Sequence, residues 1–155
     1  MSLFDDFSKK PESDSSPAAS GNKKAVFIDY IRLQTYEDGY IDRKEERKLL
    51  EHSIELGIGI DDGLSIMRDL AQQYGYVIER EVENRAKEVL KRFASSGGVI
   101  DKKEFNDTVG IFVSDCKGKV SEIETRRRLK NIILENSWKV KEGGLFGSNW
   151  FTEIS

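Results

Sequence analysis

Three acidic side chains, Asp38, Asp42 and Glu45, come closest to a set that could do chemistry. Carboxylate oxygens are the ligands that hard cations such as Ca²⁺ and Mg²⁺ prefer. The same residues also suit a helix start, where an Asp cap and a Glu three positions later bond to free backbone N–H groups. We expect a capped helix start here, with Ca²⁺ or Mg²⁺ binding at the three acids as the alternative.

The pattern of a Gly, an aliphatic residue, a capping residue and a Glu recurs twice further along the chain. Gly98 precedes Asp101 and Glu104 in the second copy, and Gly118 precedes Ser121 in the third. Glycine suits a positive φ just before a helix. Each copy therefore predicts a turn that leads into a helix through a capping box.

The first copy resembles an EF-hand calcium loop spanning residues 34–45. Gly39, the aliphatic Ile41 two positions later and Glu45 four positions after that follow the EF-hand order. The loop departs from the EF-hand at Tyr36, where an oxygen ligand is expected. The resemblance implies a loop of EF-hand shape, with a divalent-cation site as the alternative function.

The same turns are also similar to those of the TerB-like domains, compact helical modules tied to bacterial stress-response systems. The match rests on Asp38, Gly39, Ile41, Asp42 and Glu45, and on Gly98, Ile100, Asp101 and Glu104. The resemblance implies an accessory or adaptor role in such a system, with a weak divalent-cation patch.

Catalytic groups do not collect elsewhere in the sequence. The single histidine, His52, lies off the apolar stripe of its helix, and the single cysteine, Cys116, is followed by a lysine near a helix C-terminus. A helix C-terminus disfavours a thiolate, so we expect Cys116 to fill space in the core. We expect no catalytic residues, and therefore no enzyme.

One basic cluster is present, at Arg126, Arg127 and Arg128. Successive helical residues point about 100° apart, so three arginines in a row cannot share one face. A solvated rim of mixed charge is the first interpretation, and contact with an acidic partner or nucleic acid is the alternative.

Length, charge, apolar runs and cysteine content limit the class of protein to which this chain can belong. The 155 residues suit one domain, 34% are charged and the net charge is −3, which gives no electrostatic footprint for nucleic acid. No apolar run approaches the roughly 18 residues of a membrane span. One cysteine fits a reducing compartment, so we expect a cytoplasmic protein that does not enter membranes.

Apolar residues at helical spacing predict an all-α fold of six helices. They are expected at about 24–36, 43–56, 62–74, 78–94, 102–115 and 122–138. The first segment also fits the alternation of a strand, although its length favours a helix.

Three regions are expected: a disordered tail at 1–22, a helical domain at 23–138 and a Gly- and aromatic-rich segment at 139–155. Both prolines and a Ser- and Asp-rich run lie in the tail, a composition that buries too little to order itself. Leucine and aromatic residues in the two end segments are candidates for partner binding: Leu3, Phe4, Phe7, Leu145, Phe146, Trp150 and Phe151. For the aromatics of 139–155, packing on the domain's own surface is the alternative.

An internal duplication is a further hypothesis. Gly39 and Gly98 are 59 residues apart, as are Gly59 and Gly118. This offset suggests two related helix–turn–helix halves, at 38–75 and 97–134. Coincidence is the alternative, because any helix–turn–helix favours a Gly and a capping residue at its turn.

These features together favour a non-catalytic adaptor that binds another protein through the aromatic segments or a groove between the halves. No cofactor is expected. A sensor domain that binds Ca²⁺ or Mg²⁺ is the alternative.

Overall fold

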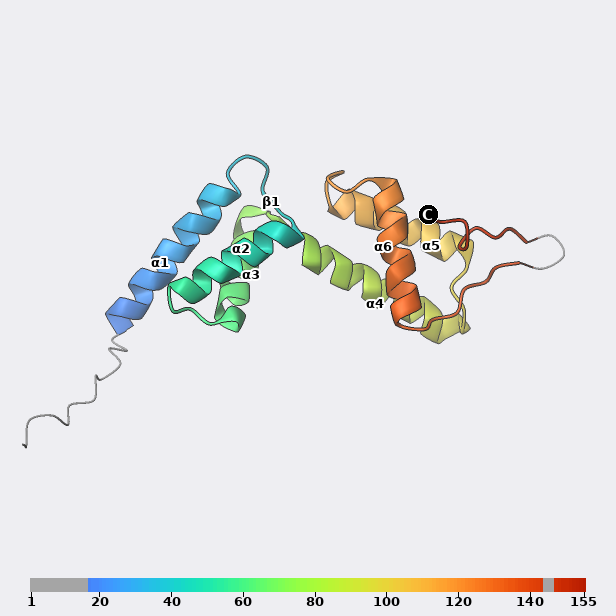
Figure 1. The fold of residues 1–155 in the computed structure, drawn as a ribbon, viewed down its shortest axis with the longest axis horizontal. Helices are drawn as coiled ribbons and strands as arrows, with labels where there is room; N and C mark the ends of the chain where they lie inside the picture. Colours follow the sequence, from blue (N-terminus) through green and yellow to red (C-terminus); the bar gives the residue numbers. More distant parts are fainter. Residues whose placement is uncertain (1–16, 144–146) are drawn as a thin grey trace, which may run out of the picture.

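The computed structural model describes residues 17–143 and 147–155, which form six helices and two very short strands (Figure 1). The elements are α1 (Pro17–Gln34), β1 (Tyr40–Ile41), α2 (Arg43–Glu55), α3 (Ile60–Tyr74), β2 (Val77–Ile78), α4 (Glu79–Gly97), α5 (Lys102–Asp115) and α6 (Glu122–Glu135). The predicted all-α class is confirmed, and α1 excludes the strand alternative for residues 24–36.

Helix α1 starts earlier than its composition indicates. Residues 17–22, assigned to the tail, are helical. Pro17 suits this position because its fixed φ matches the helix and its missing N–H would have no helical partner in the first turn.

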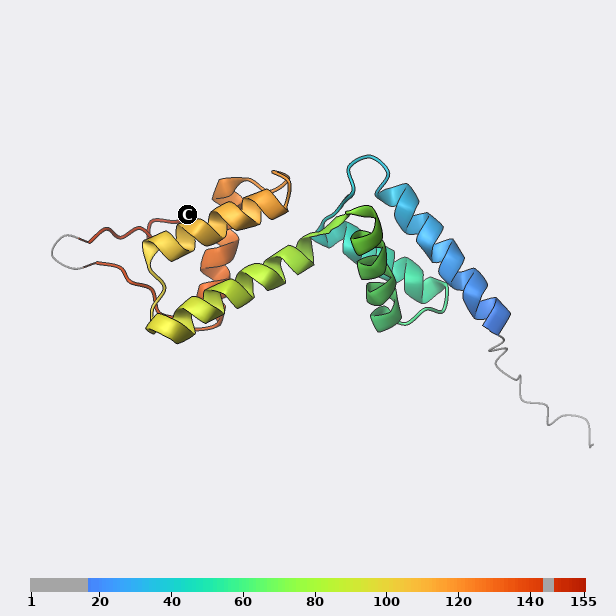
Figure 2. The same cartoon turned by 180° about the vertical axis from the view of Figure 1, so that it is seen from behind.

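Two apolar clusters divide the molecule into an N-terminal half (residues 17–78) and a C-terminal half (residues 79–155). The first cluster contains Phe27, Ile31, Ile41, Leu49, Ile66, Met67, Leu70 and Ile78. The second includes Val82, Leu90, Phe105, Phe112, Leu129 and Ile133, together with Tyr40 from the other half. Figures 1 and 2 show α1, α2 and α3 at one end, α5 and α6 at the other, and α4 leading from the first group to the second.

Short parallel pairings tie the turns together, and the sequence did not predict them. In the N-terminal half Tyr40 pairs with Val77 and Ile41 with Ile78. In the C-terminal half Ile100 forms an isolated parallel bridge with Val140. The aliphatic residues of the first two Gly-containing turns, Ile41 and Ile100, therefore each join a second segment of their own half.

Two of the three predicted capping boxes are present. Asp42 and Asp101 accept from the backbone of Glu45 and Glu104, whose carboxylates accept in return from the cap N–H groups. The Ser121 hydroxyl accepts a hydrogen bond from the Glu124 N–H at 3.2 Å, but the Glu124 carboxylate does not accept one from the Ser121 N–H, so this capping box is incomplete. The carboxylate of Glu124 binds arginine side chains instead.

The start of α3 differs from the prediction that Asp61 or Asp62 caps it. The cap is Gly59, which provides no side-chain acceptor, and both aspartates lie in the first turn. Carboxylates are favourable there because the helix dipole places partial positive charge at the N-terminus.

The order of elements repeats in a way that supports the proposed duplication. Each half has a helix, a Gly with positive φ, a bridging aliphatic residue, a capping-box Asp, two helices and a second bridging residue. The match of Gly59 with Gly118 does not hold, because φ is −64° at Gly59 and 72° at Gly118.

Among the described residues, none of the helices has the length and apolarity of a membrane span.

Candidate functional site

A groove of about 470 Å³ lies where the two halves meet, and we call it the junction groove. The N-terminal half contributes β1 and the first turn of α2. The C-terminal half contributes the starts of α4 and α6 and the residues just before α6. The lining residues are Asp38, Tyr40, Asp42, Arg43, Lys44, Glu45, Glu79, Lys119, Val120, Glu124 and Arg128.

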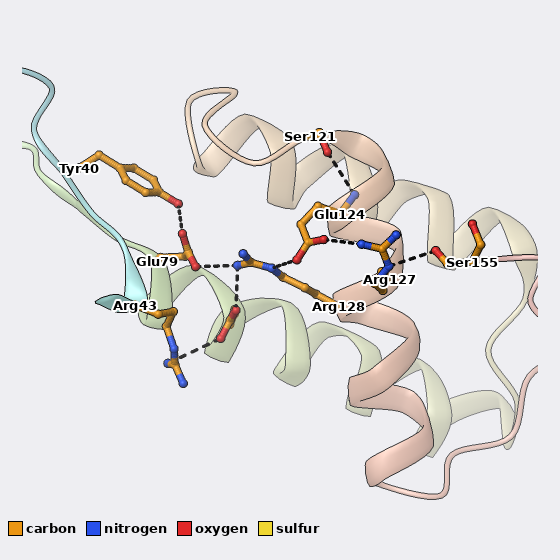
Figure 3. A network of polar contacts seen from close by, with 9 residues as sticks. Tyr40, Arg43, Glu79, Ser121, Glu124, Arg127, Arg128 and Ser155 are labelled. Atoms are coloured by element: carbon orange, nitrogen blue, oxygen red, sulfur yellow. Dashed lines mark hydrogen bonds and ion pairs between the residues drawn. The ribbon is translucent and has the colours of Figure 1, made fainter. Parts of the chain in front are cut away.

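A buried polar network runs beside this groove (Figure 3). The Tyr40 hydroxyl donates to Glu79 Oε2 at 2.7 Å, and Arg128 Nη1 donates to Glu79 Oε1 at 2.6 Å. Arg128 also reaches Glu83 at 3.1 Å and Glu124 at 2.9 Å. The Glu79 side chain is only 5% exposed, so its charge depends on these partners. Since the residues come from β1, α4 and α6, the network links the two halves.

The surroundings of Tyr40 and Arg128 fix the protonation states of these two network residues. Burial, together with the hydrogen bond to Glu79, raises the pKa of Tyr40 well above its ordinary value. Burial lowers the pKa of Arg128, but its bonds to Glu124 and Glu79 outweigh this effect and the pKa is raised. Burial also raises the pKa of Cys116, which is fully buried in the core as predicted. Tyr40 and Cys116 are therefore neutral near pH 7, and Arg128 is charged.

The three acids proposed as cation ligands all line the junction groove, but each already accepts hydrogen bonds. Asp38 accepts from Lys119 Nζ at 3.0 Å and from the Tyr40 N–H at 3.1 Å. Asp42 Oδ1 accepts from two backbone N–H groups, and Glu45 Oε2 accepts from the Asp42 N–H at 2.9 Å. The Lys119 bond lowers the pKa of Asp38 and keeps it ionised.

Within residues 17–143 and 147–155, no group of three or more His, Cys, Asp or Glu side chains is arranged to hold a metal ion.

The leucine and aromatic candidates for partner binding fall into two sets. Trp150 and Phe151 are buried against Phe105, with ring centroids 5.1 and 6.3 Å from it, so the domain itself covers them. The Trp150 indole N–H donates to the Lys141 carbonyl at 3.0 Å. The remaining candidates, Leu3, Phe4, Phe7, Leu145 and Phe146, lie outside the described residues.

The arginine cluster is more ordered than a solvated rim. Arg126 binds Glu122 at 2.8 Å, and Arg127 and Arg128 both bind Glu124 at 2.9 Å. The spacing of Glu124 and Arg128, four residues apart, is the signal that could have identified this pairing. Nothing in the local sequence points to Tyr40 or Glu79 as their neighbours.

No family model, no curated protein and no solved structure matches this chain.

Proposed function

We propose that this chain is a non-catalytic protein-interaction module that holds a partner segment in the junction groove. The observation that carries the proposal is that both halves line one groove of about 470 Å³, a size within the usual range for binding pockets. A segment bound there would contact β1, α2 and α6 together, so its affinity would depend on how the two halves are placed relative to each other.

The charges of the groove support a partner that carries carboxylates. Its acidic groups are engaged: Asp38 with Lys119, Asp42 and Glu45 in the helix cap, and Glu79 and Glu124 with Arg128. Lys44, by contrast, is exposed and its ammonium makes no ion pair with any described residue. Arg43 reaches Glu83 only at 3.6 Å. The lining as a whole carries five carboxylates and four cations, so a carboxylate of the partner would be drawn to Lys44 and Arg43 and not to the groove in general.

The resemblance of the turns to TerB-like domains supports a more specific role. In that role the chain is an accessory component of a bacterial stress-response system and recruits an acidic segment of another protein.

Charge reversal at Lys44 tests the groove. The full chain is used as bait, and the captured proteins are compared for the wild type, Lys44→Glu and Lys48→Glu. Lys48 lies one helical turn along α2, is exposed and does not line the groove. We expect a partner bound by the wild type and Lys48→Glu to be lost with Lys44→Glu at unchanged melting temperature. Equal capture by both variants would contradict the proposal.

A divalent-cation sensor is the second candidate, supported by the resemblance of residues 34–45 to an EF-hand loop; Asp38, Asp42 and Glu45 all line the junction groove, although they are not arranged around an ion. A bound ion stabilises the native state, so millimolar Ca²⁺ or Mg²⁺ should raise the melting temperature. Asp38→Asn should abolish the rise without removing the helix cap. An unchanged melting temperature in the wild type would discard this candidate.

A further inference from the structure

We propose that the chain's own acidic-aromatic segment, Leu3–Phe7, binds in a second groove on α2, which we call the isoleucine groove. This groove has a volume of about 290 Å³. Its apolar lining is Leu50, Ile54 and Ile60, and its basic lining is Arg43, Arg47 and Arg80. The inference goes beyond the junction groove and does not depend on it.

The equivalent face of α5 shows what kind of segment such a surface takes. The residue four positions after the capping aspartate is Phe105 in α5 and Glu46 in α2, and both are buried. In the C-terminal half, Trp150 and Phe151 pack over Phe105. This chain therefore already covers the first turns of one of its two capping-box helices with an aromatic pair from an end segment.

The face of α2 has no such cover among the described residues. Ile54 and Ile60 remain 54% and 51% exposed although both line the same groove. Burying apolar surface is favourable by about 25 cal/mol per Å². Two large exposed side chains in one groove therefore provide a binding surface for the leucine and phenylalanines of the segment.

The charges of the isoleucine groove match the same segment. Arg80 is paired with the buried Glu46, while Arg47 is exposed and has no ion-pair partner among the described residues. The groove holds three arginines against two carboxylates, those of Glu46 and Glu51. Leu3–Phe7 contains two adjacent aspartates and no basic residue, so its charge is complementary.

The polar pair beneath the groove is also incomplete. Glu46 Oε2 and Arg80 Nε are buried and make no hydrogen bond within the described residues. A buried polar atom without a partner costs about 1–3 kcal/mol. Both atoms have almost no accessible surface, so a segment in the groove would contact the apolar and arginine lining and not these two atoms.

The chain is long enough to reach the groove. The Lys23 ammonium lies 3.3 Å from the position that a Cβ on Gly57 would occupy, so α1 passes beside the turn that joins α2 to α3. Ile54 and Ile60 lie on either side of this turn. Pro17 lies about 9 Å further along α1, and the nine residues from 8 to 16 span at most about 30 Å. A tether of this length gives millimolar effective concentration, which favours the chain's own segment over a free one.

A spin label beside the segment tests the proposal in the full chain. Cys116 is fully buried, so a nitroxide attached to Ser8→Cys labels one site. We expect the amide signals of Ile54 and Ile60 to lose most of their intensity, while Ile123 and Leu134 of the C-terminal half keep theirs. Uniform broadening, or none, overturns the proposal.

Two disrupting variants and one control variant separate specific docking from tethering alone. Phe4→Ala with Phe7→Ala in the labelled chain should restore the signals of Ile54 and Ile60, as should Arg47→Glu, whereas Lys48→Glu should not. Persistence of the broadening in the phenylalanine variant overturns the proposal. Mixing unlabelled ¹⁵N chain with labelled ¹⁴N chain should leave the ¹⁵N signals intact, and broadening there would assign the contact to a second copy instead.

Discussion

Single residues in this protein act mainly by satisfying the ends of helices. Asp42 and Asp101 were predicted as caps from sequence spacing alone, and both form full capping boxes. Ser121 shows the limit of that reasoning, because Glu124 binds Arg127 and Arg128 and not the backbone of the cap. A hydrogen bond between a carboxylate and a charged arginine is stronger than one between a carboxylate and a neutral backbone N–H. Glu124 therefore binds the arginines one turn along α6 and not the N–H of its cap.

Removing one cap tests this assignment. Asp101→Ala should lower the free energy of unfolding by about 1 kcal/mol, since α5 loses the acceptor for the Glu104 N–H. Urea denaturation measures the change. Asp69→Ala, at an exposed position within α3, should change stability by less than about 0.5 kcal/mol. Equal losses in the two variants would mean that Asp101 does not act as a cap.

At the scale of elements, the C-terminal segment was the least predictable part of the chain. Its aromatics suggested either a partner surface or the domain's own surface, and Trp150 and Phe151 lie on the domain. The carboxylate of Glu142 holds this segment by accepting from the N–H groups of Phe151 and Thr152 and from the Thr152 hydroxyl, all within 2.9 Å.

These bonds predict an acid-sensitive segment. The Thr152 N–H is the largest cause of a pKa of Glu142 below its ordinary value of 4.5. A lowered pKa stabilises the folded state above pH 4.5, and this contribution is lost as the pH falls through the folded-state pKa. We expect exchange of the Trp150 indole N–H to accelerate below pH 4.5. The variant Glu142→Gln should show fast exchange already at pH 7, and slow exchange in that variant would contradict the role of Glu142.

At the scale of the whole molecule, the two halves are joined by α4 and by the network of Tyr40, Glu79 and Arg128 (Figure 3). The Arg128 side chain is 28% exposed and forms ion pairs with three carboxylates, which lie on α4 and α6. Because the Glu79 carboxylate is buried, the loss of its cation should leave an uncompensated charge.

Arg128→Ala should therefore lower the free energy of unfolding by about 3 kcal/mol. It should also loosen the junction, which an increased radius of gyration in small-angle X-ray scattering would report. Arg127→Ala is the matched control, because Arg127 is half exposed and its bond to Glu124 is worth at most about 1 kcal/mol. Similar losses for the two arginines would show that Arg128 does not compensate the buried charge of Glu79, and an unchanged radius of gyration in Arg128→Ala would show that the network does not hold the halves together.

The sequence by itself determined the helices, their order and two of the caps, because helical periodicity and capping depend on residues within one or two turns of each other. It also placed Cys116 in the core and indicated the repeated turn. Only the tertiary structure decided that Tyr40, Glu79 and Arg128 meet, that Trp150 covers Phe105, and that Ile54 and Ile60 remain uncovered. These contacts join residues tens of positions apart, and their geometry depends on how whole helices pack, which no local pattern contains.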